Sequence, residues 1–240
     1  MTDLIKKIID VSRISKEGHI ASSLSVLDIL FVYYKKFTEG NNKLILSKGH
    51  ASLGLYVVLD HFGLLEYDLN EFCTFNGHLG GHPSDKLKGI VAATGSLGHG
   101  LPIGVGISLG NKIQNINGHT YVIIGDGEAN EGTIWESALL ASHHKLNNLT
   151  CIMDYNRSND RALRIDEVIE KFKAFNWYTI YINGHKQSEI NSALKIRTTD
   201  KPIFILASTI KGKGIKMMEN NPEWHHKTPN DEEYKIIMEQ

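Results

Sequence analysis

The chain has 240 residues, enough for one large α/β domain or two small ones with a full hydrophobic core. A net charge of −1 and the absence of a basic tract argue against binding to nucleic acid or to an anionic membrane. The isolated cysteines Cys73 and Cys151 argue against a disulfide framework or a zinc ribbon. No stretch has the apolar length of a signal peptide or of a membrane span. We therefore expect a soluble cytoplasmic protein.

Apolar periodicity predicts helices and strands that alternate along the chain. The expected helices span residues 4–9, 25–34, 51–62, 101–110, 131–145, 189–197 and 231–238. The expected strands span residues 44–46, 121–124, 149–154, 178–182 and 203–208. Thr2 is placed to cap the first helix. The alternation predicts a single domain, residues 1–240, with an α/β fold: a doubly wound, mostly parallel sheet with helices on both faces.

The long stretch 76–99 is rich in glycine, histidine and serine and has weak periodicity, which predicts an ordered functional loop. The chain has 12 histidines, and several follow a glycine, an arrangement that lets the backbone approach a ligand while the imidazole exchanges protons. For any single one, an ordinary hydrogen-bonded loop histidine is the more frequent case. A zinc site at His78 and His82 is disfavoured because Leu79-Gly80-Gly81 is a poor helix former and no cysteine or carboxylate lies close in sequence.

The most informative segment is the motif Gly125-Asp126-Gly127-Glu128-Ala129-Asn130-Glu131-Gly132, which directly follows a predicted strand. The glycines allow a tight turn against a phosphate, although a lone Gly-x-Gly is more often an ordinary turn. Asn156 lies just past the next strand, so a crossover helix between the strands would bring Asp126 and Asn156 to one edge of the sheet. A carboxylate and an amide oxygen suit Mg²⁺ when phosphate and water complete its shell. A dinucleotide-binding fold is disfavoured because Asp126 would repel a pyrophosphate unless a metal intervened.

Several further motifs accompany the Gly125 motif. They are Ser15-x-x-Gly18-His19, the run 46–51, Gly81-His82-Pro83, the run 93–100, and the C-terminal runs 209–214 and 224–227. Together these motifs occur in the order found in transketolases. Over Ser15 to Tyr234 the chain resembles the N-terminal, diphosphate-binding half of transketolase. In particular it is similar to the N-terminal subunit of split transketolases, whose halves are separate chains. The resemblance implies a thiamine-diphosphate-binding fold, thiamine diphosphate and Mg²⁺ as cofactors, and transfer of a two-carbon ketol unit from a ketose to an aldose.

The resemblance also implies roles for individual residues. The metal ligands would be Asp126, Asn156 and the backbone carbonyl of Ser158. The cofactor contacts would be His50 and Gly127 at the phosphates, Gly95 and Leu97 around the aminopyrimidine, and Asn156 with Asp154 in support. The catalytic residues would be His19, His82 and His225 facing the substrate, and Glu131 facing an activating glutamate across an interface.

General chemistry agrees with several of these roles. A glycine amide at a helix N-terminus is well aimed at an anion, and near-neutral imidazoles suit proton shuttling at alkoxide and carbonyl oxygens. Other interpretations stay open: Glu131 also suits the first turn of a helix, and Asp154 suits a strand-end cap. A slip of one register would exchange His225 with His226.

The resemblance implies a C-terminal partner subunit that carries the activating glutamate and binds the aldose phosphate. The chain would then be inactive alone, and the active unit would hold two copies of each subunit. The small, apolar segment 98–110 suits self-association or packing against another chain. Three alternatives remain: a subunit for an unusual sugar pathway, an enzyme like deoxyxylulose-phosphate synthase with pyruvate as donor, and a degenerate binding subunit. The sequence does not identify the donor and acceptor sugars.

Overall fold

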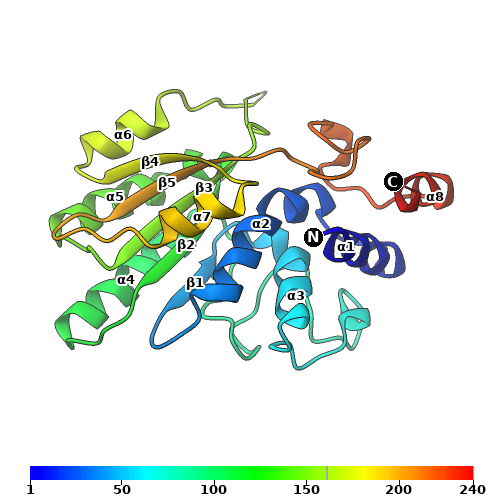
Figure 1. Cartoon of the computed structure of the whole chain (residues 1–240), viewed down its shortest axis with the longest axis horizontal. Coiled ribbons are helices and arrows are strands. Elements are labelled where there is room, and N and C mark those ends of the chain that lie inside the picture. The colour runs from blue at the N-terminus through cyan, green and yellow to red at the C-terminus, as the bar shows by residue number, and fades with distance from the viewer. Residues whose placement is uncertain (161, 240) are drawn as a thin grey trace.

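One parallel sheet organises the chain. The computed structural model describes residues 1–160 and 162–239, and its strands lie in the order β1-β2-β3-β5-β4, all parallel (Figure 1). The strands are β1 (Lys43–Leu46), β2 (Thr120–Gly125), β3 (Leu149–Tyr155), β4 (Tyr178–Asn183) and β5 (Ile203–Ser208). Strands β2, β3 and β5 are almost wholly buried, as expected for parallel strands covered on both faces. The edge strand β4 is largely exposed.

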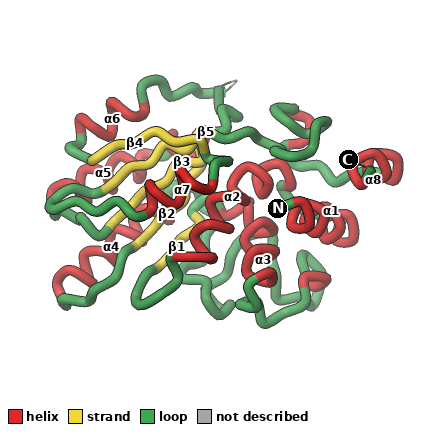
Figure 2. Tube along the Cα trace, viewed as in Figure 1, coloured by secondary structure: helices red, strands yellow, loops and turns green. Residues whose placement is uncertain are grey.

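Helices cover both faces of this sheet, and loops lie at the two ends of its strands (Figure 2). The helices are α1 (Thr2–Ser15), α2 (Ile20–Lys36), α3 (Ser52–His61), α4 (Gly100–Ile113), α5 (Gly132–His143), α6 (Val168–Ala174), α7 (Gln187–Leu194) and α8 (Asp231–Met238). Short 3₁₀ helices span Gly49–Ala51, Leu69–Glu71, Gly127–Asn130 and Pro222–Trp224. None of the helices within the described ranges is long and apolar enough to cross a membrane.

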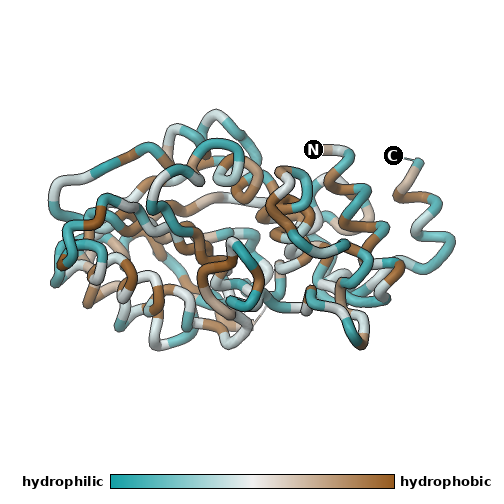
Figure 3. Tube along the Cα trace, turned by 90° about the horizontal axis from the view of Figure 1, so that it is seen from below, coloured by the Kyte–Doolittle hydropathy of each residue, from teal (hydrophilic) through white to brown (hydrophobic). Residues whose placement is uncertain are grey.

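Two hydrophobic cores lie on opposite faces of the sheet. Tyr121 and Ile123 point into the core formed with α1, α2, α3 and α7, whereas Val122 and Ile124 point into the core formed with α4, α5 and α6. This alternation follows from the two-residue period of a strand. The helices carry the matching pattern, and in Figure 3 hydrophobic and hydrophilic residues alternate along them. The predicted fold class is therefore confirmed.

Most predicted elements are present, with differences at their ends. Thr2 is the first residue of α1 and makes no capping bond, because Met1 occupies the N-cap position, so the predicted cap is wrong. Helix α2 begins at Ile20, earlier than predicted, since its first turns are already buried. Helix α6 lies between β3 and β4, where the alternation of strands and helices predicted a helical stretch without giving its bounds. Residues 72–99 contain no helix or strand, in agreement with the long loop expected there.

The carboxyl ends of the strands meet at one edge of the sheet. Strand β2 ends at Gly125, which is in register with Asp154 of β3, and Ser47 follows β1 with its amide bonded to the carbonyl of Ile123. Polar side chains that follow these strands are therefore brought together although they are far apart in sequence.

Candidate active site

A cavity of about 440 Å³ opens at the carboxyl edge of the sheet. Its lining residues are His19, Ser22, Lys48, His50, His82, Gly95, Leu97, Gly125, Asp126, Gly127, Glu128, Asn156, Ser158, Asn159, Ala162, Lys211 and His225. Every predicted site residue lines this cavity except Glu131 and Asp154. The structure thus gathers residues from both ends of the chain at one place.

Asp126 and Asn156 lie close together and share a neighbour. The Ser158 amide donates to Asn156 Oδ1 at 3.1 Å, and the Ser158 hydroxyl lies 3.3 Å from Asp126 Oδ1. The amides of Gly127 and Asn159 donate to the two carboxylate oxygens of Asp126 at 2.8 and 3.4 Å. The two predicted metal ligands therefore face the same region of the cavity instead of pointing apart.

The environment of Asp126 suits a divalent cation. Its side chain is nearly buried, and burial, with the neighbouring charge of Asp154, raises the pKa of Asp126. Within residues 1–160 and 162–239, no lysine or arginine forms an ion pair with Asp126. A buried carboxylate without a cationic partner is unfavourable, and a metal ion would relieve it.

Histidine, cysteine, aspartate and glutamate side chains can also bind a metal ion by themselves. The described part of the chain contains no group of three such side chains able to hold an ion. His78 pairs instead with Glu71 at 2.7 Å and stacks on Tyr67 at a ring distance of 4.0 Å, whereas His82 lines the cavity. His78 and His82 therefore have different surroundings in the described structure.

Histidine rings form one wall of the cavity. The ring of His19 lies 5.2 Å from that of His50 and 5.6 Å from that of His225. Burial, reinforced by the neighbouring histidines, lowers the pKa of His19 to about 4. Burial and the charge of Lys48 lower the pKa of His50 to about 2. Both rings are therefore neutral near pH 7 and have a free lone pair for a proton or a donor.

His225 and His226 are both exposed, but only His225 lines the cavity. The His226 ring lies 4.6 Å from that of His19, and its Nε2 lies 3.3 Å from Glu17. His225 Nδ1 lies 3.0 Å from the Lys211 ammonium. An ammonium group has no lone pair, so Lys211 donates to Nδ1, and neutral His225 carries its proton on Nε2. Burial and the charge of Lys48 lower the pKa of Lys211 to about 8.

The loop before α4 lines the cavity beside His82. Gly95 has φ of +141°, and a side chain there would place its Cβ 2.9 Å from the His82 ring. Leu97 also lines the cavity, and the nearby amide of Gly98 donates to Glu128 at 2.9 Å. Glycine at position 95 is therefore required by both backbone conformation and space.

Three charged residues in the cavity wall were not predicted: Lys48, Glu128 and Lys211. Glu128 accepts hydrogen bonds from the hydroxyl of Ser47 and from the amides of Gly98 and Gly125, so it joins the ends of β1, β2 and the start of α4. Each of the three residues lies inside a motif that the sequence had already singled out. Their position in sequence beside the predicted ligands could have identified them as residues of the cavity wall.

Two predicted site residues lie outside the cavity lining. Asp154 is fully buried behind the cavity, where Lys48, Ser25 and Thr209 donate to it and the Asn156 amide lies 3.3 Å away. Glu131 is exposed at the N-cap of α5. Neither residue faces the cavity directly in this chain.

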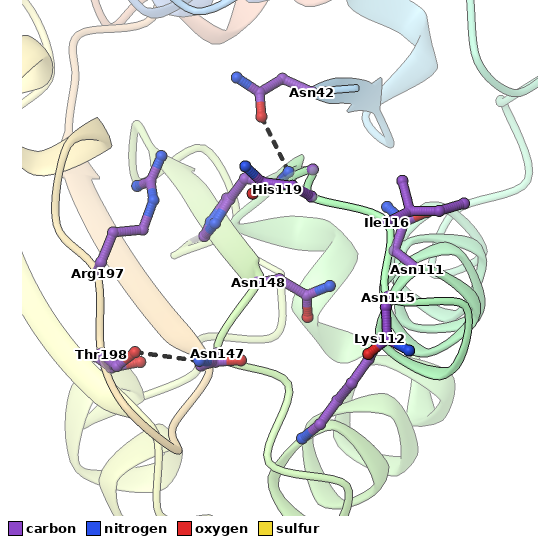
Figure 4. Close-up of a pocket in the computed structure, with 12 residues that line it drawn as sticks. Asn42, Asn111, Lys112, Asn115, Ile116, His119, Asn147, Asn148, Arg197 and Thr198 are labelled. Atoms are coloured by element: carbon purple, nitrogen blue, oxygen red, sulfur yellow. Dashed lines mark hydrogen bonds between the residues drawn. The ribbon is translucent and has the colours of Figure 1, made fainter. Parts of the chain in front are cut away.

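A second pocket, of about 450 Å³, lies at the opposite edge of the sheet (Figure 4). Asparagines dominate its lining, and Asn42 accepts the His119 amide at 2.9 Å. The charged residues in this pocket are Lys112 and Arg197, and both donate to backbone carbonyls. No predicted site residue lines it, so the candidate site is the cavity at the carboxyl edge.

Comparison with known proteins identifies the family. The family described as transketolase, thiamine diphosphate binding domain, matches residues 4–240. The chain belongs to the transketolase family. The resemblance expected from the motifs is thereby confirmed, and the matched region is the thiamine-diphosphate-binding domain of transketolase.

Relatives of two lengths match this transketolase domain. A protein of Phocaeicola vulgatus, named as one of the subunits of apulose-4-phosphate transketolase, is 32% identical over 95% of this chain and 88% of the relative. The 6-deoxy-6-sulfo-D-fructose transketolase subunit SqwG of a Clostridium species is 32% identical over 92% of this chain and 87% of the relative. Human transketolase is 34% identical over 92% of this chain but only 38% of the relative.

Solved transketolases share the fold. The structure from Campylobacter jejuni superimposes with a TM-score of 0.87 at 29% identity, over 100% of this chain and 42% of that one. The structure from Leishmania mexicana gives a TM-score of 0.89 at 23% identity, over 98% and 40%. The likeness covers the whole chain, which confirms the thiamine-diphosphate-binding α/β fold.

Proposed function

We propose that this chain, acting as one domain, is the N-terminal subunit of a two-chain transketolase that transfers a two-carbon ketol unit from a ketose to an aldose. The observation that best supports this function is the cavity in which Asp126 and Asn156 adjoin a wall of neutral histidines. Coverage of 87 to 88% of two relatives named as subunits, against 38% of human transketolase, supports the two-chain organisation.

The cavity residues suit a magnesium diphosphate. Asp126, Asn156 and the carbonyl of Ser158 would hold Mg²⁺, while His50 and the Gly127 amide would bind phosphate oxygens. In the present structure the Gly127 amide donates to Asp126, so it would turn toward the phosphate on binding. The ammonium groups of Lys48 and Lys211 add positive charge to the same wall.

Other residues would hold the organic part of the cofactor. Gly95 and Leu97 would contact the aminopyrimidine, and Asp154 would support Asn156 from behind. Bound there, thiamine diphosphate would supply the electron sink for breaking and forming the carbon–carbon bond. The protein's own part is binding, orientation and proton transfer.

The histidines of the cavity are suited to proton transfer at substrate oxygens. His19 is neutral near pH 7, so it accepts a proton or a hydrogen bond. His225 presents its Nε2 proton as a donor, since Lys211 occupies Nδ1. His82 lines the same cavity next to Gly95 and would face the same substrate.

An exposed apolar surface suits a partner. Ile103 of α4 and Leu139 and Leu140 of α5 are exposed by 38, 58 and 49%. Glu131 occupies the N-cap position of the same helix α5 without a capping bond, and a partner's activating glutamate would approach there. We propose that this surface supports self-association and binding of a C-terminal subunit, giving a heterotetramer with sites at the interfaces. The free thiols of Cys73 and Cys151 fit a cytoplasmic protein.

Reconstitution tests this proposal. The chain and its C-terminal partner are assayed separately and together for ketol transfer with xylulose 5-phosphate and apulose 4-phosphate as donors, and with pyruvate as the competing donor. We expect turnover with a ketose only when both chains, thiamine diphosphate and Mg²⁺ are present. Full turnover by this chain alone would exclude the two-chain organisation, and a preference for pyruvate would favour the synthase-like alternative.

A further inference from the structure

His185 lies outside the cavity, in the turn between β4 and α7, and joins three distant segments. Its Nδ1 lies 3.0 Å from Asp28 Oδ2 on α2, and its Nε2 accepts the amide of Ile210, past β5, at 2.8 Å. The side chains of His185 and Asp28 are only 11 and 14% exposed. Both ring nitrogens are therefore used, and water has little access to either bond.

These contacts determine the tautomer of His185. A backbone amide only donates, so Nε2 must present its lone pair to Ile210. The ring proton is therefore on Nδ1, from which it is donated to the Asp28 carboxylate. Asp28 thus selects the form of the ring that can hold Ile210.

The turn is built to bring this ring close to the segment after β5. The Gly184 amide donates to the carbonyl of Ser208 at 2.8 Å. A Cβ at position 184 would lie 2.4 Å from Thr209 Cγ2, so only glycine fits between the two segments. Asn183 completes the turn by accepting the His185 amide at 2.9 Å.

The segment held by His185 carries part of the cavity wall. The residue before Ile210 is Thr209, which donates to Asp154, and the residue after it is Lys211, whose ammonium contacts His225. The Thr209 amide is bonded to the carbonyl of Tyr155, and the Gly212 amide to that of Ala21. Ile210 lies between these two anchors, and its amide is held by a side chain.

We propose that His185 is a positioning residue that holds the Lys211 segment against the cavity by accepting the Ile210 amide in a tautomer selected by Asp28. Without this acceptor the Ile210 amide is left unpaired, and the backbone on either side of it relaxes. Lys211 then loses its fixed place beside His225. This role of His185 rests on the proposed function only in one respect, namely which ligand Lys211 contacts in the cavity.

Two near-isosteric variants separate the ring nitrogens. Glutamine in H185Q places an acceptor near the position of Nε2, whereas asparagine in H185N reaches only the position of Nδ1. Hydrogen exchange of the Ile210 amide is measured in the folded chain. We expect exchange within about threefold of wild type in H185Q and about tenfold faster in H185N. Equal exchange in wild type and H185N, or H185Q as fast as H185N, would overturn the proposal.

Binding of inorganic pyrophosphate with Mg²⁺ tests the link to Lys211. We expect H185N and K211M each to weaken binding by about tenfold, with no further loss in the double variant, because both act through the same ammonium group. H185Q and K186A should bind as wild type does, since Lys186 is exposed and pairs only with Glu189 among the described residues. Losses that add in the double variant would contradict the link. Failure of the wild type to bind would contradict the proposed function instead, while the exchange result would still decide the role of His185.

Discussion

Lys48 and Asp154 form an ion pair that is buried completely, with side-chain exposures of 1 and 0%. Burial alone raises the pKa of Asp154, but the charge and hydrogen bond of Lys48, with bonds from Ser25 and Thr209, hold this pKa below its ordinary value. Lys48 also lines the cavity, so the pair links the core of the sheet to the proposed cofactor site.

Replacing Lys48 by methionine should destabilise the fold strongly. The variant leaves the Asp154 carboxylate buried without its counter-charge, which lowers the free energy of unfolding by about 3–5 kcal/mol. Urea unfolding at pH 7 measures the change. The matched control is K88M, which breaks the exposed pair with Glu66 and should change stability by less than about 1 kcal/mol. Similar losses in the two variants would show that burial of the Lys48 pair has no special effect.

Replacing Asp126 by asparagine should abolish metal-dependent binding while preserving the fold. The amide keeps the shape of the side chain but removes the hard anionic oxygen that Mg²⁺ requires, so we expect affinity for thiamine diphosphate with Mg²⁺ to fall at least about a hundredfold. Calorimetric titration of the reconstituted complex measures it, with D85N on the exposed loop as control. Unchanged affinity in D126N would place the metal elsewhere.

Two glycines of α4 should respond oppositely to alanine. A Cβ at Gly104 would lie 2.4 Å from Val122 Cγ2, so G104A should destabilise the chain by about 1–3 kcal/mol. Gly106 has no atom within 4 Å of the added Cβ, so G106A should stabilise it by about 0.5–1 kcal/mol. Chemical unfolding of both variants measures the two changes in stability. If G106A is stable but no longer forms an active complex with the partner subunit, the interface lies on α4.

His119 should make the fold sensitive to acid. It is 5% exposed and lies near Arg197 in the pocket shown in Figure 4. Its Nε2 lies 2.7 Å from Thr150 Oγ1, and burial with the charge of Arg197 lowers its pKa to about 3. Between pH 3 and 6.5 the unfolded chain binds a proton at this site and the folded chain does not, so stability falls as the pH decreases through that window.

The loss attributable to His119 is about 2 kcal/mol at pH 5 relative to pH 7. The variant H119Q keeps a partner for Thr150 but does not titrate, so it should lose less stability than wild type by that amount. Urea unfolding at both pH values measures it. The comparison removes the contributions of His19 and His50, which are present in both proteins. Equal losses in the two proteins would show that His119 is protonated in the folded state.

Local pattern predicted the sheet and the central ligands. Apolar runs such as 121–124 identified parallel strands, and the residues just past them, Asp126 and Asn156, were assigned to one edge by connectivity alone. The bounds of helix α6 were not predicted, because only Val168 and Phe172 are buried and the remaining positions are largely charged. The predicted cap at Thr2 was wrong because Thr2 is already the first residue of the helix, and the N-cap position belongs to Met1.

The sequence by itself determined the fold class, the family and most of the cavity lining, because periodicity, turn chemistry and motif order are properties of neighbouring residues. Only the tertiary structure decided that Lys48 pairs with Asp154, 106 residues away, that His225 and not His226 enters the cavity, and that His185 holds Ile210. Those outcomes depend on which polar groups are buried together. Burial is set by the packing of segments that are distant in the chain, so no local pattern encodes it.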